Sequence, residues 1–145
     1  MRTPKTFLIL STFLFAGALA LGCGSKTSAA ECKALEAAAD KADEKAVQLI
    51  VPGVDTYADF KKAADEIEEA SKIFAAVDIK GAELKAIRDQ RTKQLDEFVA
   101  AVRALKGDAA AEVPKGDAEK ISKLSSGVTT GAIDMIAATV KICPQ

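Results

Sequence analysis

Apolar side chains recur at steps of three and four residues in four stretches of this chain, and this spacing restricts the fold more than any other feature. In the first stretch the steps alternate through Cys32, Leu35, Ala39, Ala42, Ala46 and Leu49. Such spacing places side chains on one face of an α-helix, which packs that face against other helices. We therefore expect an all-α fold, an antiparallel four-helix up-down bundle formed by residues 29–145.

Capping patterns and a turn indicate where the first two helices begin and end. Ser28 precedes Glu31 by three residues, and Thr56 precedes Asp59 by three, a spacing in which hydroxyl and acid cap each other's backbone. The Pro-Gly dipeptide at residues 52–53 should end the first helix. The face of the second helix that we expect to be buried consists of Tyr57, Phe60, Ala64, Ile67, Ser71 and Phe74.

The third helix, expected over residues 82–106, has a polar interruption. Its apolar face is predicted to be Leu84, Ile87, Leu95, Phe98, Val102 and Leu105. Residues 88–94 are all polar, and Arg91 falls near the apolar face. Arg91 could face an anionic ligand or an acid on another helix. Alternatively its stem packs while its guanidinium reaches water, and we expect this second arrangement.

The fourth helix should follow a connection at residues 107–116 and begin with Asp117 as N-cap. Its apolar side is predicted to be Ile121, Leu124, Val128, Met135, Ile136, Val140 and Ile142. Gly127 and Gly131 stand four residues apart in its centre. We expect them to allow a close approach of helices or a bend. The alternative is that both glycines, with Arg91, line a small ligand pocket.

The N-terminus has the layout of an export signal. Arg2 and Lys5 precede a mostly apolar run at residues 7–21, which is shorter than the roughly 20 residues of a membrane span. Gly22-Cys23 closes this run and resembles the lipobox of bacterial lipoprotein precursors. The resemblance implies removal of residues 1–22 and acylation of Cys23, which would bind membrane lipid. Residues 23–28 would form a short tether. The alternative is an ordinary signal peptide cut elsewhere.

The residues around the lipobox also bear on location. Gly24 stands where bacterial lipoproteins retained in the inner membrane often have aspartate. If the bacterium is Gram-negative, the resemblance therefore implies the periplasmic face of the outer membrane. Residues 79–105 resemble the helical part of small proteobacterial lipoproteins of uncharacterised function, a likeness that implies no activity.

Two further cysteines lie at the ends of the expected bundle. Cys32 is at the start of the first helix and Cys143 at the end of the fourth, and an up-down bundle brings these ends to the same pole. An exported protein meets oxidising conditions, so we predict a structural Cys32–Cys143 disulfide. Closing such a loop would add roughly 4 to 5 kcal/mol of stability. Two free thiols or a redox pair remain the alternatives.

Composition narrows the function. The chain has no histidine, which removes the commonest metal ligand and acid–base group, and we predict no metal and no cofactor. Removal of residues 1–22 takes away two basic residues and changes the formal charge from -1 to -3, so we expect no nucleic acid partner. No spacing selects a catalytic pair.

Two functions follow from these observations. We expect a lipid-anchored, non-enzymatic envelope protein that serves as a structural or protein-interaction module, with an envelope protein as its partner. The alternative is a periplasmic carrier or sensor that binds a small apolar or anionic ligand between helices. The periodicity fits both a monomer and a dimer, so it leaves the oligomeric state open.

Overall fold

The computed structural model describes residues 27–46 and 56–143, and this part of the chain is all-helical, as the apolar periodicity predicts. Its four helices are α1 (Ala29–Ala46), α2 (Tyr57–Ala75), α3 (Ala82–Arg103) and α4 (Lys115–Ile142). The described residues contain no strand, and one isolated bridge joins Thr56 to Glu112. The expected helix end at residues 52–53 lies outside the described residues, as do Leu49 and Cys23.

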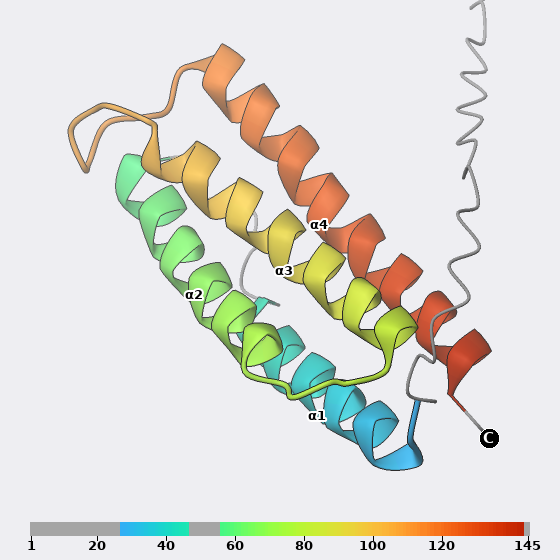
Figure 1. Cartoon of the computed structure of the whole chain (residues 1–145). Coiled ribbons are helices and arrows are strands. Elements are labelled where there is room, and N and C mark those ends of the chain that lie inside the picture. The colour runs from blue at the N-terminus through green and yellow to red at the C-terminus, as the bar shows by residue number, and fades with distance from the viewer. Residues whose placement is uncertain (1–26, 47–55, 144–145) are drawn as a thin grey trace, which may run out of the picture.

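Helices that follow one another in the chain lie side by side (Figure 1). α2 packs against α1 on one side and α3 on the other, whereas α4 packs mainly against α3. A disulfide between Cys32 and Cys143 joins the first turn of α1 to the residue that follows α4. The predicted disulfide is therefore present, and it ties the helix with the fewest neighbours back to the start of the bundle.

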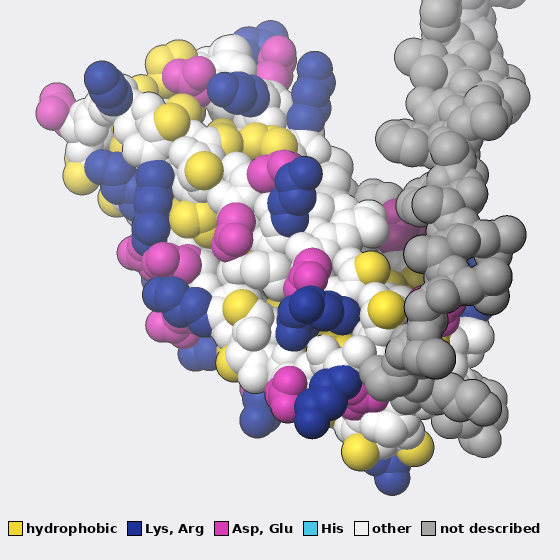
Figure 2. Space-filling view, in the orientation of Figure 1, with side chains coloured by type: hydrophobic (Ala, Val, Ile, Leu, Met, Phe, Trp, Pro, Cys, Tyr) yellow, Lys and Arg dark blue, Asp and Glu magenta, His cyan; other side chains and the backbone are white. Residues whose placement is uncertain are grey.

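The core lies between α1, α2 and α3 and extends to the inner face of α4. The largest side chains that are fully buried are Phe74, Phe98, Leu35, Ile67, Leu84, Leu95 and Val102. The predicted inner face of α2 is correct, with Phe60 partly buried and the other five positions buried. Lysine, arginine and acidic side chains are spread over the outer surface shown in Figure 2.

Both predicted capping boxes are present. The Glu31 carboxylate accepts hydrogen bonds from the backbone and hydroxyl of Ser28, and the Ser28 hydroxyl accepts one from the Glu31 N–H. Thr56 and Asp59 form the same reciprocal pair at the start of α2. The connection between α3 and α4 completes this second cap, because its carbonyls accept hydrogen bonds from the first two N–H groups of α2.

The ends of α3 and α4 differ from the prediction. α3 ends at Arg103, where the following N–H groups bond to carbonyls two to four residues back and tighten the last turn. α4 begins at Lys115 with Pro114 as N-cap, so the prediction of Asp117 as N-cap is wrong. The fixed φ of proline suits a helix start, and the Pro114 carbonyl accepts the Asp117 N–H at 2.9 Å.

The buried face of α4 also differs from the prediction. Ile136 and Val140 are 53% and 57% exposed, so their expected burial is wrong. Gly131 and Thr139 are buried instead. α4 has one main neighbour, so only a narrow face is covered. Burial of Thr139 is possible because its hydroxyl donates to the carbonyl of Met135 at 2.8 Å.

Candidate functional site

Arg91 is a buried cation in the interface between α3 and α4. The residue is 4% exposed, and its Nη1 donates a hydrogen bond to the Val128 carbonyl on α4 at 2.5 Å. The expectation that its guanidinium reaches water is therefore wrong. α4 passes close enough to α3 to cover the whole side chain, which the sequence of α3 alone could not indicate.

The charge of Arg91 has little compensation within the described part of the chain. No described carboxylate forms an ion pair with it, and its Nε has no hydrogen-bond partner there. Burial lowers the pKa of the Arg91 guanidinium, and the charge of Asp43 on α1 acts weakly in the opposite direction. Burying a cation without a close partner is costly, so this arrangement is a candidate for function.

A cavity of about 160 Å³ lies beside Arg91 between α3 and α4. Gln90 and Gln94 contribute amides from α3, and Asp134 contributes a carboxylate from α4. The apolar part of the wall is formed by Ile87, Met135 and Ala138. The cavity thus combines a buried guanidinium, neutral polar groups and an apolar wall.

The two glycines of α4 have different environments. Gly131 is buried and lines the cavity, and a Cβ at this position would overlap the side-chain amide of Gln94. Gly127 is exposed and has open space at its Cβ position, so the close approach expected at Gly127 does not occur. Of the three residues predicted to face a ligand, the structure brings Arg91 and Gly131 together at this cavity and leaves Gly127 on the surface.

Glu31 has a second role that the sequence did not indicate. Besides capping α1, its Oε1 accepts hydrogen bonds from the backbone N–H of Lys80 at 2.6 Å and of Gly81 at 3.2 Å. Hydrogen bonds from Ser28 and from this turn lower the pKa of Glu31 to about 2. One carboxylate therefore joins the start of α1 to the turn before α3. The capping-box pattern identifies Glu31 as a cap of α1. It does not indicate the partners in the turn before α3, which lie about 50 residues away in the sequence.

The disulfide lies at the same end of the bundle as this Glu31 contact. Cys32 directly follows Glu31, and its Cα is 5.8 Å from that of Cys143. The start of α1, the turn between α2 and α3, and the end of α4 are thus held together by one carboxylate and one covalent bond. Cys23, the predicted lipidation site, lies outside the described residues.

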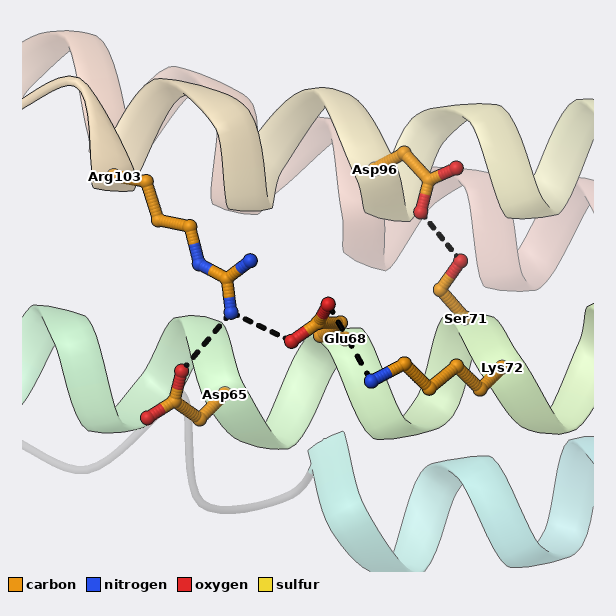
Figure 3. A network of polar contacts seen from close by, with 6 residues as sticks. All are labelled: Asp65, Glu68, Ser71, Lys72, Asp96 and Arg103. Atoms are coloured by element: carbon orange, nitrogen blue, oxygen red, sulfur yellow. Dashed lines mark hydrogen bonds and ion pairs between the residues drawn. The ribbon is translucent and has the colours of Figure 1, made fainter.

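Asp65 and Glu68, two acidic residues of α2, take part in ion pairs on the surface (Figure 3). Arg103 of α3 points toward Asp65 and Glu68 of α2, at 3.2 and 2.6 Å. The hydrogen bond from Arg103 lowers the pKa of Glu68. This network is solvent-exposed and joins two helices. In the described part of the chain, no group of three or more acidic, cysteine or histidine side chains could hold a metal ion.

No described helix is both long and apolar enough to cross a bilayer. Comparison of the chain with models of known protein families, with curated proteins and with solved structures finds no match. The function must therefore be inferred from the chain's own residues.

Proposed function

We propose that this chain is an exported, lipid-anchored and non-enzymatic envelope protein, a structural or protein-interaction module. The observation that carries the proposal is the Cys32–Cys143 disulfide. Structural disulfides persist in oxidising compartments outside the cytoplasm, which agrees with an export signal at residues 1–22. With two of the three cysteines paired, Cys23 is the one left for a lipid.

The geometry of the bundle supports an orientation at the membrane. We infer that consecutive helices alternate in direction, because the disulfide and Glu31 hold the start of α1, the end of α4 and the α2–α3 turn at one pole. Residues 24–27 span at most about 14 Å when extended. A tether of this length would keep that pole near the bilayer and direct the α3–α4 connection away from it, on the periplasmic side of the outer membrane in a Gram-negative cell.

Acylation and location can be tested with one variant. Wild-type protein should incorporate a labelled fatty acid, sediment with membranes and begin at Cys23, whereas Cys23→Ser should lose the label and retain residues 1–22. Ser25→Ala is the matched control, because it changes a residue of the proposed tether and keeps all three cysteines. An unlabelled wild-type protein would contradict the proposal.

The module role requires a neighbour in the envelope. Crosslinking in intact cells should join the wild-type protein reproducibly to another envelope protein, and mass spectrometry would identify the adduct. The same treatment of Cys23→Ser should lose this adduct, because the anchor sets the location of the bundle. Equal adducts in both would contradict an anchored module.

The cavity beside Arg91 supports a second candidate function, a periplasmic carrier or sensor of a small ligand. Arg91 is buried, charged and only partly hydrogen-bonded, and it lines the cavity together with Gly131. Saturable binding of a small ligand that is lost in Arg91→Met, with the fold intact, would separate this function from that of a purely structural module.

A further inference from the structure

We infer that the cavity between α3 and α4 is a binding site for a short-chain monocarboxylate, whose carboxylate pairs with the guanidinium of Arg91. This inference deepens the carrier function proposed above and rests on it. It does not depend on acylation of Cys23, because the cavity lies within the helical bundle.

The hydrogen bonding of Arg91 leaves the terminal Nη2 for an anion. Nη1 is engaged by the Val128 carbonyl, and Nε is buried with no partner among the described residues. A ligand in the cavity would therefore meet Nη2, whose N–H groups can donate charge-assisted hydrogen bonds to a carboxylate. A carboxylate there would supply the close negative charge that no ion pair with a described residue supplies.

The remaining wall fits the rest of such a ligand. The Gln94 amide packs on Gly131 and adds a polar group to the wall, and Ile87 and Met135 offer apolar contact to an alkyl chain. A volume of about 160 Å³ corresponds to roughly five water molecules. A chain of four or five carbons has the matching size.

Asp134 restricts the charge of the ligand. Its carboxylate lines the same cavity and repels any anionic ligand, and this repulsion grows with the charge of the ligand. Asp43 also lies near enough to act on Arg91. The site therefore favours a monoanion over phosphate, sulfate or a dicarboxylate, and it favours a carboxylate over a neutral alcohol of the same length.

The experiment uses isothermal titration calorimetry on the disulfide-bonded protein at pH 7, with pentanoate as the probe. Pentanol, pentylamine and glutarate are compared with it. Arg91→Met should weaken pentanoate binding by about tenfold or more, because the charged hydrogen bonds are lost. Arg103→Met is the matched control, an arginine on the same helix whose partners lie on the surface. Asp134→Asn should strengthen binding several-fold.

Circular dichroism of each variant confirms that it is folded. Pentanoate binding that depends on Arg91 and exceeds glutarate binding supports the inference. Binding of pentanol equal to that of pentanoate would overturn the carboxylate site while leaving a carrier of apolar ligands. No binding of any probe to the folded wild type would overturn both the site and the carrier function.

Discussion

Replacing Arg91 with methionine should raise the stability of the ligand-free protein. The substitution keeps a side chain of similar length and removes a buried cation that has one hydrogen bond and no described ion pair. The lost hydrogen bond contributes about 1.5 to 3 kcal/mol, whereas desolvation of the guanidinium costs several kcal/mol. Replacement of buried charges by well-packed apolar residues is often stabilising by about 1 to 4 kcal/mol, and we expect about 1 to 2 kcal/mol here.

Urea denaturation followed by circular dichroism measures this change, with the disulfide kept intact. The urea concentration at the midpoint of unfolding should rise, while the slope of the free energy of unfolding against urea concentration stays constant. Arg103→Met controls for the loss of any arginine from α3 and should lower stability by no more than about 1 kcal/mol, because its ion pairs are exposed. A loss of stability above about 2 kcal/mol in Arg91→Met would contradict this prediction, since the charge of Arg91 would then be well compensated.

Three further predictions concern other positions in the bundle. The folded protein lowers the pKa of Glu31 from 4.5 to about 2, so the ionised carboxylate stabilises the fold at pH values above 4.5. This stabilisation is lost as the pH falls toward 2. Glu31→Gln should therefore lower the melting temperature at pH 7 and flatten its decline between pH 4.5 and 2. Gly127→Ala should stabilise α4 by about 1 kcal/mol, since its Cβ position is open, whereas Gly107→Ala should destabilise because its Cβ would overlap the Tyr57 ring. Thermal melts of both variants would check these opposite signs. Opening the disulfide by Cys143→Ser should cost roughly 4 to 5 kcal/mol, a loss that urea denaturation would measure.

α2 shows what the sequence could predict. Its start and inner face follow from local rules, because Thr56 and Asp59 cap the backbone three residues apart and the apolar residues keep a helical period. The Cys32–Cys143 pair was predictable for a related reason. The expected export would permit a disulfide, and an up-down arrangement of four helices predicts that the start of α1 and the end of α4 lie at one pole.

α4 shows where such rules stop. Periodicity identifies its apolar residues, but the number of neighbouring helices decides how wide a face is buried. With α3 as its main neighbour, α4 leaves Ile133, Ile136 and Val140 exposed and buries Thr139. Apolar periodicity alone therefore overestimates the width of the buried face of α4.

The candidate site was predictable only in part. The position of Arg91 near the apolar face of α3 drew attention to it, but its burial depends on the path of α4. Gly131 and Gly127 are equivalent as sequence features, yet only Gly131 faces a neighbouring side chain. The second role of Glu31 depends on two N–H groups about 50 residues away, a contact that no local pattern encodes.

The intact mass of the protein, released with mild detergent from the membranes of the cells that produce it, tests the proposed lipid anchor. We expect a chain that begins at Cys23, carries acyl groups and lacks two hydrogens because Cys32 and Cys143 are joined. After reduction, the mass should rise by those two hydrogens while the lipid remains. A mature chain without acyl groups, or one that begins at another residue, would contradict the lipid anchor.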